Sequence, residues 1–120
     1  MEPAELANRF NDCINRRDLA GLAELMTPDH VFTDAVGDRV PGKAACVEAW
    51  RGFFEQFPDY RNTFTEVISR GETAIGVGYS TCALPALQGP ALWTVTVRGN
   101  QVAHWRVYSD TPEVRAELGI

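Results

Sequence analysis

The sequence predicts an α+β fold in one domain over residues 1–120, with three N-terminal-half helices packed against a strongly curved antiparallel sheet. Apolar residues recur at helical spacing up to about Phe57 and alternate along the chain from about Tyr60 onward. Such segregation of helices and antiparallel strands is typical of α+β proteins rather than doubly wound sheets. Gly76 and Gly78 lie within one expected strand, where glycine permits a bend or a close backbone approach. We therefore expect a cone-shaped barrel around a mostly apolar pocket.

The first expected element is an amphipathic helix of about 14 residues with Pro3 in its first turn. Asp18 is placed to cap a short second helix, which Thr27-Pro28 ends. A third helix is expected over about 43–57. Each helix carries an apolar face at spacings of three and four residues. These faces are Leu6, Phe10 and Ile14 in the first helix, Leu19, Leu22, Leu25 and Met26 in the second, and Val47, Trp50, Phe54 and Phe57 in the third.

A brief strand is expected over 30–34, between the second and third helices, with turn residues after it. Four long strands then form a meander, and glycine-containing turns join its first pair and its last pair. These strands cover about 61–70, 73–84, 90–98 and 101–109. Leu118 and Gly119 are expected to form a short terminal turn.

The overall charge argues against several classes of partner. The formal net charge is −5, and the 11 Lys and Arg residues are scattered without a basic stripe. Nucleic acid and anionic membranes are therefore not expected as partners. No apolar run approaches the ~20 residues that a bilayer requires, and the acidic N-terminus does not resemble a signal peptide.

The cysteines and histidines give no sign of a bound group. Cys13, Cys46 and Cys82 are odd in number and far apart, which favours reduced thiols, a cytoplasmic location and places in the core. Their spacing relative to the two histidines matches no metal site. The sequence also lacks a phosphate-binding glycine loop, so we expect no metal and no cofactor.

Five segments of the chain, taken together and in order, resemble a known family. They are Asn15-Arg16-Arg17-Asp18-Leu19, Phe32-Thr33-Asp34, Gly42-Lys43, Phe57-Pro58-Asp59-Tyr60-Arg61, and His104-Trp105-Arg106-Val107-Tyr108-Ser109-Asp110 with Leu118-Gly119 after it. The chain resembles, over nearly its whole length, the SnoaL-like (polyketide-cyclase-like) branch of the nuclear-transport-factor-2-like superfamily. The resemblance implies a cystatin-like cone. It does not fix a function, because the superfamily includes cyclases, isomerases, epoxide hydrolases, dehydratases and non-catalytic binders.

Asp110 is the first candidate for a catalytic residue. In the cyclase relatives an aspartate ending the last strand is the acid or base, so the resemblance implies this role for Asp110. Desolvation at the mouth of an apolar pocket would raise its pKa toward a useful range. The alternative is that Asp110 caps the terminal turn. Tyr108, about 7 Å away along the strand, is the expected assistant, whereas His104 at roughly 20 Å is too far to share a proton.

Asp34 is the second candidate. It follows the first strand much as the base-bearing segment does in ketosteroid isomerases, which resemble the chain here, although it also suits a turn. Those enzymes hold a dienolate with a tyrosine and a protonated aspartic acid. In this chain the positions that match those two residues look like Phe10 and Trp93, and neither side chain is expected to form that oxyanion hole. Steroid isomerisation by that mechanism is therefore not expected. His30 lies two strand steps from Asp34 and is interpreted as a surface or rim residue.

The resemblance assigns Trp50, Tyr79 and Trp93 to the wall of the pocket. A cavity lined by indoles and phenols suits a flat, largely apolar ligand with one or two polar groups. Epoxide hydrolysis requires an Arg-x-Asp on a middle strand, and residues 73–97 contain no charged residue. It is therefore retained only as a distant alternative.

Three hypotheses about function remain open. The first is a cofactor-independent acid/base enzyme that cyclises, isomerises or hydrates a small, largely apolar carbonyl compound. The second is a non-catalytic domain that binds a small molecule in the same pocket. The third is a structural dimeriser. A homodimer through the exposed face of the sheet is expected in each case, and Leu92 or Val107 would supply apolar contacts there.

Overall fold

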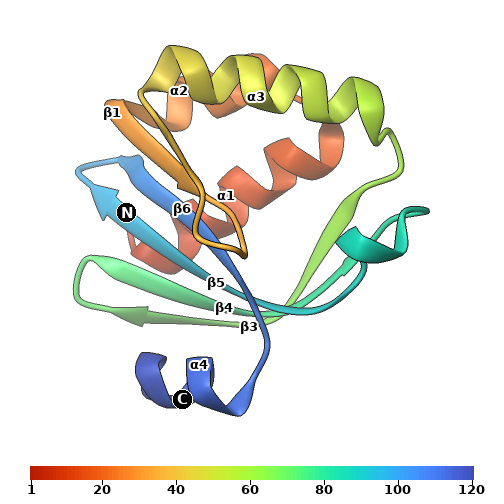
Figure 1. The fold of residues 1–120 in the computed structure, drawn as a ribbon. Coiled ribbons are helices and arrows are strands. Elements are labelled where there is room, and N and C mark those ends of the chain that lie inside the picture. Colours follow the sequence, from red (N-terminus) through yellow and green to blue (C-terminus); the bar gives the residue numbers. More distant parts are fainter.

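The computed structural model describes all residues from 1 to 120, and it has two layers with a small helix beneath them (Figure 1). The helices are α1 (Pro3–Arg16), α2 (Leu19–Leu25), α3 (Lys43–Gln56) and α4 (Pro112–Leu118), with a 3₁₀ turn η1 (Pro85–Leu87). The strands are β1 (Met26–Thr33), β2 (Arg39–Pro41), β3 (Arg61–Arg70), β4 (Thr73–Thr81), β5 (Gly89–Arg98) and β6 (Gln101–Ser109). No helix is long and apolar enough to cross a membrane.

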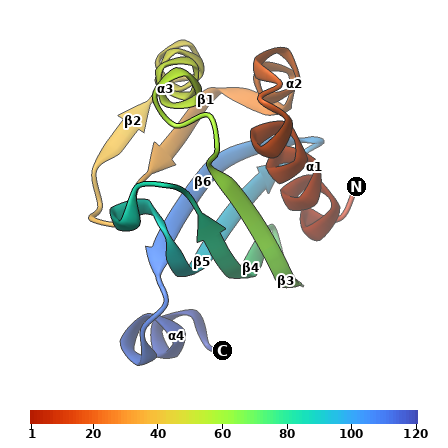
Figure 2. The same cartoon turned by 90° about the vertical axis from the view of Figure 1, so that its right-hand side faces the viewer.

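The six strands form one curved, open sheet in the order β2-β1-β6-β5-β4-β3. Helices α1, α2 and α3 lie on one side of this sheet, and α4 lies on the other side (Figures 1 and 2). The predicted α+β cone is thereby confirmed. One strand pair differs from the expected antiparallel pattern, because β1 runs parallel to β6. The two strands are distant in sequence, so no hairpin constrains their relative direction.

Several element boundaries differ from those predicted. β1 begins at Met26, directly after α2, and is longer than the expected strand over 30–34. β2 was not predicted, since three residues carry too little alternation to identify a strand. The segment 82–84 is not part of β4. The expected terminal turn is helix α4, which Thr111 caps by accepting a hydrogen bond from the backbone N–H of Val114 at 3.2 Å.

Gly78 provides the close backbone approach that the sequence indicated. A Cβ atom there would lie 2.9 Å from the carbonyl carbon of Thr63 and would overlap its oxygen. The contact lies beside a bulge, because the pairing of β3 with β4 shifts between Phe64 and Glu66. A Cβ on Gly76 would instead meet only the Phe64 ring, at 3.3 Å. The two strands can approach and bend here because Gly78 has no side chain.

The core lies between α1 and the concave face of the sheet. Phe10 is fully buried and stacks on Trp105, with ring centroids 4.6 Å apart. Cys13, Cys46 and Cys82 are free and buried, as their interpretation as core residues required.

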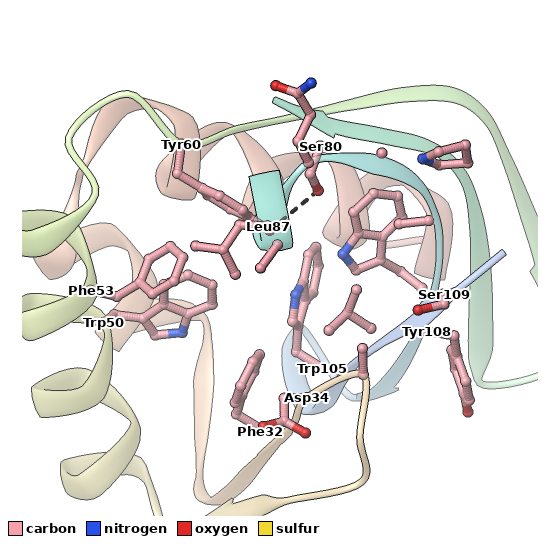
Figure 3. A pocket seen from close by; sticks show the side chains of 18 residues that line it. Phe32, Asp34, Trp50, Phe53, Tyr60, Ser80, Leu87, Trp105, Tyr108 and Ser109 are labelled. Carbon is pink, nitrogen blue, oxygen red and sulfur yellow. Dashed lines mark hydrogen bonds between the residues drawn. The ribbon is translucent and has the colours of Figure 1, made fainter. Parts of the chain in front are cut away.

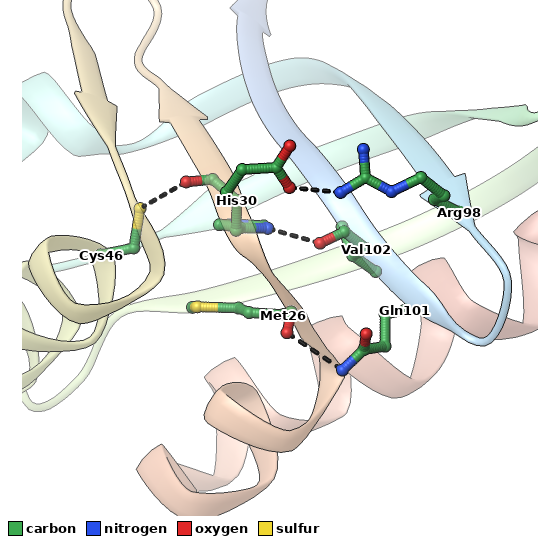
Figure 4. Close-up of polar contacts among 7 residues, drawn as sticks. Met26, His30, Cys46, Arg98, Gln101 and Val102 are labelled. Carbon is green, nitrogen blue, oxygen red and sulfur yellow. Dashed lines mark hydrogen bonds and ion pairs between the residues drawn. The ribbon is translucent and has the colours of Figure 1, made fainter.

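His30 is a core residue, so its predicted place at the surface or rim is wrong. Its side chain has no exposed area and lies beside Phe10, with ring centroids 5.5 Å apart. Nδ1 lies 2.7 Å from the carbonyl oxygen of Val102 (Figure 4). Since a carbonyl only accepts, Nδ1 carries the proton and donates it. Burial lowers the pKa of His30, because a charged imidazolium is costly in this core.

Arg17 holds the turn after α1 against the turn after α3. Its backbone is left-handed, with φ 60°, as is common just beyond a helix C-terminus. The guanidinium donates hydrogen bonds to the carbonyl oxygens of Pro58 at 2.6 Å and Ile14 at 3.1 Å. It also lies 5.4 Å from the Phe54 ring centroid. These contacts fix the end of α3, from which part of the pocket wall projects.

The outer face of the sheet differs from the one expected for a dimer. Leu92 points away from the cavity, because its neighbour Trp93 lines the cavity and successive side chains of a strand alternate. It has no exposed area in the single chain, which carries α4 on the outer side of the sheet (Figure 2). Arg70 ties α4 in place by donating to the carbonyl oxygens of Leu118 and Gly119, each at 3.0 Å. Val107 lies on the opposite face, where it lines the pocket, so its predicted place on the outer face is wrong.

Candidate functional site

The candidate site is a cavity of about 200 Å³ between α3, the end of β1 and the concave face of β4, β5 and β6 (Figure 3). Of its 18 lining residues 12 are hydrophobic, which gives the mostly apolar pocket that the sequence predicted. Residues 86–89, in and just after η1, form part of the wall. A cavity of this volume and lining suits a small, flat molecule of roughly one or two rings.

An aromatic cluster forms the wall on the α3 side. Trp50 and Phe53 project from α3, three residues apart, so both reach the same side of the helix. The Trp50 ring meets Phe53 at 5.7 Å and Phe32 at 5.5 Å in edge-to-face geometry. Phe53 in turn meets Tyr60 edge-to-face at 4.8 Å. These rings orient one another and present both faces and edges to a ligand.

Asp34 is the only carboxylate among the residues that line the cavity. It follows β1 and opens the turn to β2, where its Oδ1 accepts hydrogen bonds from the N–H groups of Val36 at 3.0 Å and Asp38 at 2.9 Å. These two bonds fix the orientation of the carboxylate and use one oxygen. They leave Oδ2 available to a ligand. Asp34 thus forms the turn and also lines the cavity, the two places that the sequence suggested for it.

Tyr60 and Ser80 add a polar patch that the sequence interpretation missed. The Ser80 hydroxyl donates to Asn62 Oδ1 at 2.7 Å, so its oxygen accepts from the Tyr60 hydroxyl at 3.3 Å. Burial raises the pKa of Tyr60, which keeps the phenol protonated. Asn62 is anchored to α1, because Asn15 accepts from its N–H at 2.9 Å and donates to its carbonyl oxygen at 2.8 Å.

Of the three residues expected to bind substrate, Trp50 and Trp93 line the cavity and Tyr79 does not. Tyr79 is 43% exposed, whereas Ser80 is buried. Successive side chains of a strand point to opposite faces, so the residue beside Tyr79 takes the inward place. Trp105 also lines the cavity, although the sequence interpretation assigned it no pocket role.

Tyr108 lies at the edge of the lining, but its hydroxyl group points away from the centre of the cavity (Figure 3). The hydroxyl lies 3.4 Å from Thr94 Oγ1, and the Arg106 guanidinium lies 4.5 Å from the ring centroid. This arrangement turns the phenol toward the outer face of the sheet. Its assistance to a catalytic aspartate stays a prediction.

Asp110 lies outside the lining of the cavity. Arg115 of α4 donates to both of its carboxylate oxygens, at 2.7 and 2.9 Å. This guanidinium lowers the pKa of Asp110, so the predicted rise from desolvation is wrong. Thr111, not Asp110, caps α4. A catalytic role for Asp110 stays a prediction, and the contacts that it makes are those of an ion pair.

His104 takes no part in the cavity. Its Nε2 lies 2.8 Å from Thr33 Oγ1, and burial lowers its pKa, with further contributions from the charges of Arg39 and Arg106. The sequence interpretation likewise separated it from Asp110. No group of three or more His, Cys, Asp or Glu side chains is arranged to hold a metal ion.

Comparison with solved structures identifies relatives that share this fold at low sequence identity. A candidate polyketide cyclase from Sinorhizobium meliloti is 20% identical, with 86% of this chain and 93% of that chain covered and a TM-score of 0.78. A candidate ketosteroid isomerase from Kribbella flavida is 20% identical, with 97% and 86% covered and a TM-score of 0.73. An LEH-like epoxide hydrolase from M. tuberculosis is 14% identical, with 90% and 78% covered and a TM-score of 0.80.

These structural neighbours have different activities in their names, so the likeness establishes the fold alone. A search of curated proteins finds no match. The model of the SnoaL-like domain family matches residues 7–113, which include both aspartates and every residue of the cavity. The chain therefore belongs to the SnoaL-like domain family of the nuclear-transport-factor-2-like superfamily.

Proposed function

We propose that this protein is a cofactor-independent acid/base enzyme that moves a proton beside the carbonyl group of a small, largely apolar compound. One observation carries the proposal: Asp34 places a single carboxylate, with Oδ2 unbound, on the wall of an otherwise apolar aromatic cavity. A carboxylate held against the carbon next to a carbonyl group can act as the general base for a proton on that carbon. Cyclisation and isomerisation can begin with such a step, and hydration of a conjugated carbon–carbon double bond can end with its reverse.

In the proposed step, Asp34 Oδ2 removes a proton from the carbon next to the carbonyl. The electron pair of the broken C–H bond forms a carbon–carbon double bond, and the carbonyl π pair moves to oxygen to give an enolate. The enolate then either attacks an internal carbonyl carbon, giving an alkoxide that takes the proton from Asp34, or takes that proton at another carbon. In either case Asp34 returns to the carboxylate form. Tyr60 and Ser80 supply hydroxyl groups on another part of the wall, able to orient a polar group of the compound.

Exchange of carbon-bound hydrogen for deuterium tests this step without knowledge of the natural substrate. The protein is incubated in D₂O with 1-tetralone, cyclohexanone and aromatic ketoesters, and loss of the α-proton signals is followed by ¹H NMR. We expect exchange above the buffer rate for at least one compound. Asp34→Asn should reduce it by about 10²–10⁴-fold, because a positioned base contributes about that much. Asparagine retains the Oδ1 acceptor, so the turn is preserved.

Two variants serve as controls. Asp38→Asn removes an exposed carboxylate from the same turn and should leave exchange unchanged. Asp110→Asn tests the other candidate aspartate. If Asp110→Asn abolishes exchange while Asp34→Asn does not, the base has been assigned to the wrong residue. If the wild-type protein exchanges no compound faster than buffer, the enzymatic proposal fails.

A non-catalytic small-molecule-binding domain is the second candidate. The observation that favours it is the pair of backbone hydrogen bonds to Asp34, which is also what a turn-forming aspartate makes. A ligand that raises the melting temperature equally in wild type and in Asp34→Asn, with no exchange in either, would support this function. Epoxide hydrolysis has less support, because the lining provides one carboxylate and no second acidic residue.

A homodimer also belongs to the proposal, as does the expectation that neither nucleic acid nor a membrane is a partner. A dimer contact through the outer face of the sheet could not use Val107, which lines the cavity, or Leu92, which is already buried in the single chain. Sedimentation equilibrium of the wild-type protein measures the mass directly. A monomer at all concentrations up to about 100 μM would exclude a functional homodimer at ordinary affinities.

A further inference from the structure

The molecule contains six buried polar side-chain atoms without a hydrogen-bond partner. They belong to Asn11, Thr27, His30, Asn62, Trp93 and Arg106. Among these residues only Trp93 also lines the cavity. Its unpartnered atom is the indole Nε1, which is a donor and cannot accept. Trp93 is therefore a wall residue with a buried N–H group that has no hydrogen-bond partner.

The position of Trp93 leaves its N–H without an obvious internal acceptor. The side chain is fully buried on the concave face of β5, opposite Gly76 in β4 and Val107 in β6. Its ring packs on Phe64, with centroids 4.9 Å apart. None of the side chains of these three neighbours has an oxygen atom. A buried tryptophan N–H ordinarily finds a partner, and an unmet donor costs stability.

Phenylalanine would fill much of this space without any unmet donor. Tryptophan at this position lowers the stability of the empty protein, because its buried N–H has no partner. A ligand that supplies an acceptor in the cavity removes this loss. Nε1 is shielded from solvent in the empty cavity, so the donor is not competing with bulk water. A ligand acceptor that reaches this N–H forms its hydrogen bond in an environment of low dielectric.

We infer that the indole N–H of Trp93 donates a hydrogen bond to the carbonyl oxygen of the ligand in this cavity. The inference rests on the proposed function for the carbonyl and goes beyond it by assigning a specificity-determining residue. The ligand class is then a flat, one- or two-ring ketone or ester whose oxygen is directed toward β5. In the proton-transfer step, this N–H would stabilise the charge that develops on the same oxygen. Trp93 would thus donate a hydrogen bond to the ligand oxygen, a role that the resemblance to isomerases did not lead us to expect.

Nuclear magnetic resonance of the indole groups tests the contact directly. The protein contains three tryptophans, so a ¹⁵N-labelled sample gives three indole signals, and Trp93→Phe identifies one of them. The probes are 1-tetralone and its hydrocarbon counterpart tetralin. We expect 1-tetralone to move the Trp93 indole proton downfield and tetralin to leave it nearly unchanged. If Trp93→Phe does not fold, Trp50→Phe and Trp105→Phe assign the remaining signal by elimination.

Binding constants provide the second readout. Trp93→Phe should weaken the binding of 1-tetralone by roughly tenfold, as expected for the loss of one hydrogen bond. It should change the affinity for tetralin little. The matched control is Phe53→Leu, which alters a wall residue without a polar group and should change the affinities for the two probes equally. The inference is overturned if 1-tetralone does not shift the Trp93 indole signal. It is also overturned if Trp93→Phe lowers the affinities for 1-tetralone and tetralin by the same factor. Because neither readout requires turnover, a shifted Trp93 signal without deuterium exchange would retain this inference and reject the enzymatic proposal.

Discussion

Replacing Gly78 with alanine tests whether backbone contact at this position sets the curvature of the sheet. The added Cβ would overlap the carbonyl oxygen of Thr63 and lie 3.1 Å from the Cα of Phe64. Both are parts of the β3 backbone, which no side-chain rotation can move aside. We expect β3 to separate from β4 locally, with the loss of about two ladder hydrogen bonds at ~1 kcal/mol each and ~1–3 kcal/mol of strain.

The free energy of unfolding should therefore fall by about 3–5 kcal/mol. For a chain of 120 residues the unfolding entropy is roughly 0.25 kcal/mol/K, so the melting temperature should fall by about 12–20 °C. Urea and thermal unfolding followed by circular dichroism measure both quantities. Gly76→Ala is the matched control, because its Cβ would meet a movable Phe64 ring at 3.3 Å, and it should cost less than about 1 kcal/mol. A Gly78→Ala protein as stable as Gly76→Ala would refute the reasoning.

Three further predictions concern titration and helix ends. Burial holds the folded-state pKa of His30 below the unfolded value of about 6.5, so its contribution to stability is present above that pH and is lost as the pH falls toward the folded value. His104 adds to this loss. Urea midpoints between pH 7.5 and 5.5 should fall in wild type and fall less in His30→Gln, and equal slopes would contradict the assignment. Arg17→Gly removes the guanidinium contacts and should cost about 2–3 kcal/mol, while Arg17→Ala should cost about 1 kcal/mol more from its left-handed backbone; urea unfolding that ranks alanine above glycine would count against this. Arg115→Ala should raise the pKa of Asp110 toward its ordinary value and alter stability by less than about 1 kcal/mol, and a carboxyl-carbon NMR titration that does not move would show that the ion pair is absent in solution.

The two aspartates show how far sequence reasoning reaches toward a site. Asp34 and Asp110 each come directly after a strand, so the local sequence treats them alike. Only the folded chain separates them: one carboxylate lines the cavity, and the other pairs with Arg115. The guanidinium of Arg115 could be recognised as a partner only once α4 was known to be a helix rather than a terminal turn.

The sequence by itself determined the first three helices, the long strands and the curved α+β architecture. The repeat of apolar residues selects helix or strand locally, and this pattern located α1, α3 and the four-strand meander within a few residues. The close backbone approach at Gly78 could also be predicted, because a glycine inside a strand often marks a bend or a close contact between backbones. Such features depend on neighbours within a few positions along the chain.

The tertiary structure alone decided which side chains meet in the cavity. Alternation shows that Tyr79 and Ser80 face opposite sides of the sheet, but it does not show which of the two faces inward. His30 entered the core because β1 pairs with β6, some 70 residues later in the chain. The free N–H of Trp93 likewise results from what β4 and β6 place around it. Contacts of this kind depend on strand register and packing between distant segments, which local periodicity does not encode.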